Sequence, residues 1–184
     1  MSEIVKSIKS MKLYSHLERI NNELNQLGID ESSPLDASDL SPFDNLHYHG
    51  ADAVRRAISE LRLTTEHRVL EIGSGLGGPA RIMASVAGCH VTALEIQSDM
   101  DKLASELTSR CALRDQVTHI CGDVLTYDLE PKKYDATLSW LAYYHIREHP
   151  TLFSRIATAL KPEGMIYIED LTALRPFSKI EQNL

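Results

Sequence analysis

The sequence predicts an α/β fold, in which a doubly wound parallel sheet of about five strands follows an N-terminal helical extension. From Arg68 onward, short runs rich in β-branched residues alternate with helical patterns, which indicates successive βαβ units. A glycine-rich turn that begins at Gly73 joins the first of these strands to a helix, as in Rossmann-like folds. Right-handed crossovers then place a ligand crevice at the carboxyl edge of the sheet.

The N-terminal extension is expected to be mainly helical. Apolar residues recur every three or four positions from Ile4 to Leu27, and Gly28 follows as a stop signal, so this stretch predicts one long amphipathic helix. Its apolar stripe would cover the domain core or a substrate cleft, or pair with another subunit, and the sequence does not choose. Residues 29–44 are rich in Ser, Asp and Pro and predict a connecting loop, whereas residues 51–63 predict a second helix.

Strands and helices then alternate along the chain. Strands are expected at residues 68–72, 90–95, 116–121, 134–138 and 165–169. Helices are expected at residues 79–87, 98–111 and 150–160, with a short one near Ala142. Ser98 and Asp101 resemble a capping box at the start of the middle helix, and residues 161–164 form a helix stop before the last strand.

Composition and charge favour a protein whose partners are small molecules. The chain of 184 residues can bury one core, and its net charge of −7 disfavours a nucleic acid as the partner. No apolar run reaches the roughly 18 residues of a membrane span. Residues 1–10 lack the hydrophobic segment of a signal peptide, so we expect a cytoplasmic protein with no membrane partner. The three cysteines lack metal-type spacing, so no metal site is expected.

The glycine turn is part of a motif that indicates a nucleotide cofactor. Gly73, Gly75 and Gly78 fit the pattern G-x-G-x-x-G, and Glu95 ends the second strand 22 residues after Gly73. A carboxylate at that position accepts hydrogen bonds from a ribose 2′,3′-diol. Both NAD and S-adenosylmethionine contain this diol, so the motif alone leaves the two cofactors open.

Two further carboxylates help to choose between these cofactors. Glu71 lies two residues before Gly73, where its charge would repel a pyrophosphate but attract a cation. Asp123 follows the third strand, where it could accept a hydrogen bond from an adenine amino group while Val124 packs on the ring. Each acid also has a structural explanation: Glu71 could cap its own turn, Glu95 could be a solvated strand end, and Asp123 could be a turn residue.

At these residues the chain resembles the class I S-adenosylmethionine-dependent methyltransferases. The matching stretches are residues 69–81, 91–95, 122–124, 134–140 and 160–164. Within that superfamily, the glycine turn, His47-Tyr48-His49-Gly50 and Tyr144-His145-Ile146 are most similar to the branch of sarcosine/dimethylglycine, phosphoethanolamine, tocopherol and sterol methyltransferases. The resemblance covers roughly residues 43–170 and is specific for the cofactor fold but loose for the substrate.

The resemblance implies S-adenosyl-L-methionine as the cofactor and S-adenosyl-L-homocysteine as the product. It implies that the glycine turn holds the methionine moiety, Glu95 the ribose and Asp123 the adenine. His47, Tyr48 and His49 would close over the methionine end, with Tyr48 as a hydrogen-bond donor. The cofactor-binding residues expected are Tyr48, Glu71, Gly73, Ser74, Gly75, Glu95, Ile96, Asp123, Val124 and Trp140. Residues 1–63 would then be a helical extension with a cofactor-covering loop, and residues 64–184 the cofactor-binding core, in one compact unit.

The acceptor would lie beyond the fourth strand. His145 is the candidate acid or base, because its ordinary pKa lies near neutrality. Tyr144 and His145 are the candidate substrate residues, and Trp140 could hold a methylated ammonium by a cation–π interaction. The alternatives for His145 are a pocket wall and a satisfied core histidine, since methyl transfer to a nucleophilic acceptor needs mainly alignment and desolvation.

The resemblance implies methyl transfer to a small molecule, and an amine, as in sarcosine/dimethylglycine N-methyltransferases, is the favoured acceptor. Two alternatives stay open: a noncatalytic module that binds S-adenosylmethionine or oligomerises, and an NAD-dependent oxidoreductase. The family sheet is usually completed by a helix and a hairpin with one antiparallel strand, whereas only residues 170–184 follow the last expected strand. We therefore expect the hairpin to be missing, which leaves an open sheet edge. That edge or the N-terminal helix could join a homo-oligomer.

Overall fold

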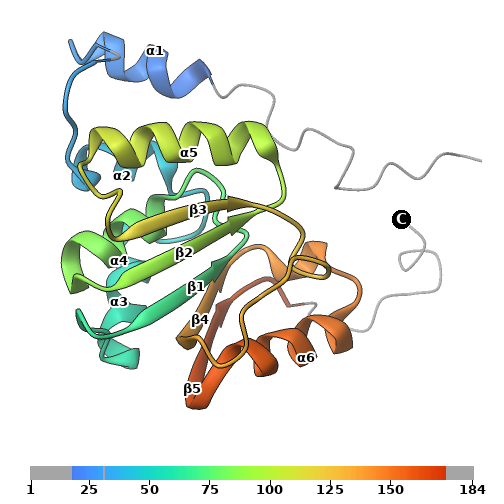
Figure 1. Ribbon diagram of the computed structural model, residues 1–184. Coiled ribbons are helices and arrows are strands. Elements are labelled where there is room, and N and C mark those ends of the chain that lie inside the picture. The colour runs from blue at the N-terminus through green and yellow to red at the C-terminus, as the bar shows by residue number, and fades with distance from the viewer. Residues whose placement is uncertain (1–17, 31, 173–184) are drawn as a thin grey trace, which may run out of the picture.

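A parallel sheet of five strands forms the centre of the structure, a computed structural model that describes residues 18–30 and 32–172 (Figure 1). The strands are β1 Arg68–Ile72, β2 His90–Glu95, β3 Val117–Cys121, β4 Tyr134–Trp140 and β5 Leu160–Glu169. They lie in the order β3-β2-β1-β4-β5, and each neighbouring pair is parallel. The predicted α/β fold class is confirmed.

Strand β1 lies in the middle of the sheet because its side chains are apolar toward both faces. Val69 and Leu70 are both completely buried, and successive strand residues point to opposite faces. The chain proceeds from β1 to β2 and β3 on one side, then returns to place β4 and β5 on the other. This reversal of strand order opens a crevice at the carboxyl ends of β1 and β4.

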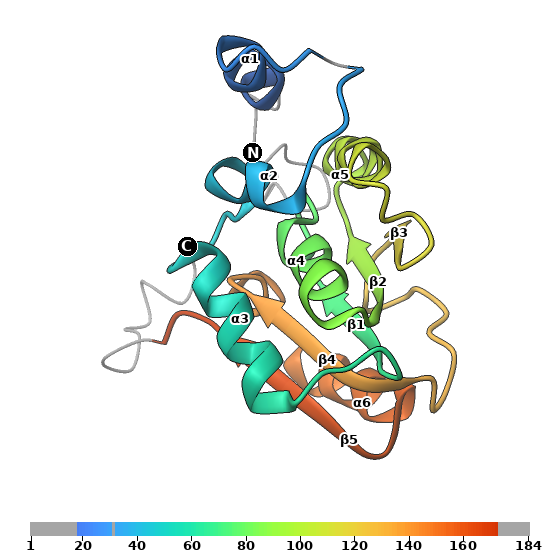
Figure 2. The ribbon, with the colours of Figure 1, turned by 90° about the vertical axis from the view of Figure 1, so that its left-hand side faces the viewer.

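Helices cover the two faces of the sheet. They are α1 Glu18–Gln26, α2 Ala37–Asp44, α3 Gly50–Leu61, α4 Gly78–Ala87, α5 Ser98–Arg110 and α6 His149–Ala159, with a short 3₁₀ turn, η1 Tyr143–His145. Val54 of α3 and Met83 of α4 pack with Val91 on one face, and Ile156 of α6 packs with Leu70 on the other. Figure 2 shows α3 and α4 in front of the sheet and α6 behind it.

The N-terminal helices extend the core beyond the sheet. Leu24 of α1 and Leu40 of α2 are buried in one cluster with Leu107 of α5. The predicted N-terminal helix is confirmed over α1, and Gly28, at φ +78°, follows its end. The rest of that prediction, residues 4–17, lies outside the described residues. Within the described part of the chain, no helix combines the length and apolarity needed to cross a membrane.

The prediction of a loop over residues 29–44 is wrong, because helix α2 ends this stretch. Its Ser, Asp and Pro content is typical of loops, but the complete burial of Leu40 stabilises a helix here. The Asp36 N–H donates to the carboxylate of Asp39 at 3.0 Å, which stabilises the start of the helix. Tertiary burial thus outweighs local composition in this segment.

Two smaller predictions also fail. The N-cap of α5 is Gln97 rather than Ser98, so Ser98 and Asp101 do not form the predicted capping box. Strand β5 starts at Leu160 instead of residue 165, and the predicted helix stop at residues 161–164 is a bulge within it. Glu163 has φ +64° there, and the pairing register with β4 shifts at this point.

Candidate active site

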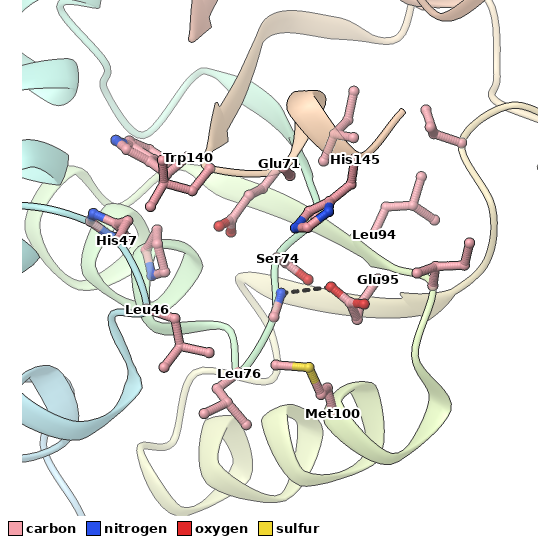
Figure 3. A pocket seen from close by; sticks show the side chains of 18 of the residues that line it. Leu46, His47, Glu71, Ser74, Leu76, Leu94, Glu95, Met100, Trp140 and His145 are labelled. Atoms are coloured by element: carbon pink, nitrogen blue, oxygen red, sulfur yellow. Dashed lines mark hydrogen bonds between the residues drawn. The ribbon is translucent and has the colours of Figure 1, made fainter. Parts of the chain in front are cut away.

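One pocket at the carboxyl edge of the sheet brings together most of the predicted site residues (Figure 3). The predicted residues that line it are Glu71, Gly73, Ser74, Gly75, Glu95, Ile96, Asp123, Val124, Trp140 and His145. They come from the ends of β1, β2, β3 and β4 because parallel strands end at one common edge. Tyr48 and Tyr144 are not among the lining residues.

The glycine turn forms the floor of this pocket. Gly73 has φ +72°, and its N–H donates to the Leu94 carbonyl at 2.9 Å. A Cβ on Gly73 would lie only 2.3 Å from the Cβ of Ala142, so the turn and the segment after β4 approach in a way that only glycine permits. Helix α4 begins directly behind the turn at Gly78, with Pro79 in its first turn.

Glu95 is held rigidly at the edge of the pocket. Its Oε2 accepts the Gly75 N–H at 2.8 Å, drawn as a dashed line in Figure 3, and its Oε1 accepts the Gln97 N–H at 2.9 Å. Burial raises the pKa of Glu95, while the two backbone donors oppose the rise. A buried carboxylate with fixed oxygens contradicts the alternative of a solvated strand end.

Glu71 is a buried carboxylate that points into the pocket (Figure 3). A backbone hydrogen bond from Ala80 reaches it, so it partly caps the first turn of α4. Its Oε2, however, has no hydrogen-bond partner among the described residues. Burial raises the pKa of Glu71 well above its ordinary value, and the charge of Arg81 opposes the rise. A cationic ligand at Oε2 would supply the missing partner and would favour the ionised form of Glu71.

Replacing Glu71 with glutamine is expected to change how stability depends on pH. Because the folded pKa is raised, the folded protein keeps a proton that the unfolded chain loses above its ordinary pKa of 4.5. This contribution to stability is complete below that pH and is lost as the pH rises toward the folded pKa. As the pH rises above that ordinary pKa, the wild-type free energy of unfolding should therefore fall relative to that of Glu71→Gln. Parallel urea-unfolding curves across this rise in pH would contradict it.

Asp123 lies where the adenine role requires it but also shapes its own turn. Its Oδ1 accepts the Leu125 N–H at 2.9 Å, as a turn aspartate does, and the residue lines the pocket after β3. The buried Val124 beside it provides an apolar contact. The turn explanation of Asp123 is therefore confirmed, and the adenine contact stays a prediction.

The segment after β4 forms the wall opposite the glycine turn. The carboxylate of Asp170 accepts the N–H groups of Tyr143 at 2.8 Å and of Tyr144 at 3.1 Å, which fixes η1. His145 faces the pocket above Ser74 (Figure 3), and burial lowers its pKa while the charge of Asp170 opposes the change. Tyr144 is 48% exposed, its ring packs against that of His145 at a tilt of 38°, and it does not line the pocket, so the structure does not place it in the predicted substrate position.

The segment between α2 and α3 reaches the pocket through His47, one of the three residues expected to close over the methionine end, and not through Tyr48. Tyr48 is 63% exposed and does not line the pocket, whereas His47 does. The His47 ring stacks on Trp140, with centroids 5.6 Å apart. The His-Tyr-His motif identified the right segment, but it carries no signal for which side chain turns inward. Sequence reasoning also missed Asp44, Leu46, Leu76 and Met100, which line the pocket.

Known proteins share this sequence pattern. A family model described as "Methyltransferase domain" matches residues 70–168, more than half of the chain. Phosphoethanolamine N-methyltransferase 2 of Caenorhabditis elegans is 36% identical over 105 residues, covering 54% of this chain and 23% of that protein. Glycine/sarcosine/dimethylglycine N-methyltransferase of Actinopolyspora halophila is 24% identical over 130 residues, covering 71% and 23%.

Solved structures share the same fold. A phosphoethanolamine N-methyltransferase 2 from Haemonchus contortus, in complex with S-adenosyl-L-methionine, aligns with a TM-score of 0.70 at 25% identity and covers 89% of this chain and 38% of that one. A putative sarcosine dimethylglycine methyltransferase from Galdieria sulphuraria aligns with a TM-score of 0.62 at 26% identity, covering 65% and 46%. This chain spans only about a quarter of the length of the two N-methyltransferases above. The chain belongs to the methyltransferase domain family, in the class that depends on S-adenosylmethionine.

Proposed function

We propose that this chain binds S-adenosyl-L-methionine in the pocket at the carboxyl edge of the sheet and transfers the methyl group to a small amine. The observation that carries the proposal is the convergence of Glu71, Glu95 and Asp123 around one glycine turn. The names of the similar proteins, which act on sarcosine, dimethylglycine or phosphoethanolamine, support an amine as the acceptor.

Polar side chains in the pocket are placed to bind such a cofactor. Glu71 Oε2 and Ser74 Oγ are buried in the pocket without hydrogen-bond partners among the described residues, so a polar ligand would satisfy both. Glu71 suits a cationic group, and Glu95 suits the ribose hydroxyls. When bound, S-adenosyl-L-methionine supplies a methyl group on a sulfonium that is open to attack by a nucleophile.

The residues of this chain would contribute alignment, exclusion of water and proton transfer. Trp140 and Ile146 give the pocket an apolar wall that excludes water, which strengthens the attraction of the carboxylates for a cation. We assign His145 to the acceptor side, where its neutral imidazole can take a proton from the amine nitrogen. Its pKa, lowered by burial, keeps the imidazole unprotonated at neutral pH.

Cofactor binding and methyl transfer can be tested separately. The full chain is titrated by calorimetry with S-adenosyl-L-methionine, S-adenosyl-L-homocysteine and NADH, and we expect only the first two to bind. Turnover is then measured with methyl-labelled cofactor and sarcosine, dimethylglycine or phosphoethanolamine. Binding of NADH alone would overturn the proposal.

A noncatalytic module is the second candidate. It is favoured by the exposed Ile166 and Ile168 on edge strand β5, which could meet a partner. Tight binding of the cofactor with no label transferred to any acceptor would support this module over the enzyme. A second copy bound at this edge or at the N-terminal helix remains a prediction for either candidate.

His145→Ala is expected to lower turnover by about 100-fold or more while the affinity for S-adenosyl-L-homocysteine stays the same, because the side chain would act on the acceptor. Tyr144→Phe is the matched control, since it keeps the ring that packs against His145. Initial rates at saturating cofactor provide the measurement. Equal turnover of His145→Ala and wild type would reduce His145 to a pocket wall.

A further inference from the structure

Arg81 of α4 is completely buried and links three segments that surround the pocket. One terminal nitrogen of its guanidinium, Nη2, donates to the Asp44 carboxylate at 2.7 Å and to the Leu76 carbonyl at 2.6 Å. The other, Nη1, donates to the Ala104 carbonyl at 3.1 Å and to the Thr108 hydroxyl at 3.0 Å. A single side chain thus ties the end of α2, the glycine turn and α5 together.

Asp44 is the partner that connects Arg81 to the pocket wall. It is the last residue of α2, is 2% exposed and lines the pocket. A Cβ on Gly78 would lie 2.8 Å from the Asp44 carboxylate, so the end of α2 sits directly on the start of α4. The following Leu46 and His47 also line the pocket. The position of Asp44 therefore sets the position of this wall.

Arg81 is the main counterion of Asp44, whose Oδ1 also accepts a hydrogen bond from Asn45 Nδ2 at 3.0 Å. Burial raises the pKa of Asp44, and the charge and hydrogen bond of Arg81 are the main opposing influences. A buried carboxylate that loses its cation must take up a proton or move toward water. Either change would shift the segment that carries His47, whose ring rests on Trp140.

We propose that Arg81 is a positioning residue: through Asp44 it holds residues 44–47 over the cofactor pocket and keeps His47 against Trp140. The assignment of the pocket to the cofactor rests on the proposed function, whereas the positioning of the wall does not. The competing explanation is that the pair only stabilises the fold.

The test uses Asp44→Asn in the full chain, because asparagine is nearly the same size and keeps a carbonyl oxygen that can accept from Arg81. Arg81→Lys is the second variant, since it keeps the charge but cannot make all four hydrogen bonds. Asp52→Asn is the matched control, because Asp52 pairs with Arg55 at 3.2 Å on the exposed side of α3, away from the pocket lining. Urea unfolding identifies the variants that fold.

The fluorescence of Trp140 is a readout that would not change in the variants if the Arg81–Asp44 pair only stabilised the fold. Trp140 is the only tryptophan in the chain, so its fluorescence in the folded, ligand-free protein reports the contact with His47. We expect an altered emission maximum and intensity in Asp44→Asn and in Arg81→Lys. We also expect the affinity for S-adenosyl-L-homocysteine to fall about tenfold or more in both variants, with Asp52→Asn unchanged in emission and affinity.

Unchanged emission and affinity in folded Asp44→Asn would overturn the positioning role and leave the pair as a stabiliser of the fold. Failure of the proposed function gives a different result: the wild type itself would not bind S-adenosyl-L-homocysteine. In that case the Trp140 emission still decides whether Arg81 positions the wall.

Discussion

Glu95→Ala is expected to weaken the binding of S-adenosyl-L-homocysteine by about 1 to 3 kcal/mol, because the ribose hydroxyls lose a charged acceptor. The loss has a second origin in the glycine turn. Glu95 also accepts the N–H groups of Gly75 and Gln97, so the alanine variant leaves both without this partner. Calorimetric titration of the folded variant at fixed pH and salt measures the change in binding free energy.

Glu95→Gln separates these two origins. Glutamine keeps one carbonyl oxygen for a backbone N–H but gives up the negative charge, so its loss of affinity should be smaller than that of Glu95→Ala. The exposed Glu106 on α5 provides the control, since Glu106→Ala removes a carboxylate away from the pocket lining. Wild-type affinity in a folded Glu95→Ala protein would refute the ribose role.

The sheet could be predicted because its physical requirements are local. A parallel strand buried on both faces needs a mostly apolar sequence, and β1 and β2 are largely apolar and are followed by turn or helix signals. Helix α2 could not be predicted in this way. Its stability comes from burying Leu40 against residues far along the chain, such as Leu107, and no neighbouring residue reports that contact.

Some residues of the candidate site could likewise be predicted from the sequence, and others could not. Glu95, Asp123 and Trp140 could be predicted because the ends of parallel strands share one edge, so their place follows from the strand assignments alone. The inward turn of His47 in place of Tyr48 depends on backbone angles within a loop, where His49 has φ +64°. The helical pattern predicts Arg81 on a helix, but its complete burial depends on partners from two other helices.

Gly73→Ala is expected to destabilise the protein by about 2 to 5 kcal/mol and to abolish measurable binding of the cofactor. A left-handed backbone with φ +72° costs a residue with a Cβ about 1 to 2 kcal/mol. The added Cβ would also lie 2.3 Å from the Cβ of Ala142, so the segment that carries His145 must move away. Overpacking of this kind costs about 1 to 3 kcal/mol.

The strain and the clash can be distinguished by two companion variants. Gly28 has φ +78°, and a Cβ added there would meet nothing within 4 Å, so Gly28→Ala should show only the cost of the left-handed backbone. Adding Ala142→Gly to Gly73→Ala removes the clashing methyl group and should restore part of the stability and of the affinity, because the next contact is 3.8 Å away. Urea unfolding and calorimetry are compared across the set. A double variant with the same stability and affinity as Gly73→Ala would show that the contact with Ala142 is not the reason why position 73 requires glycine.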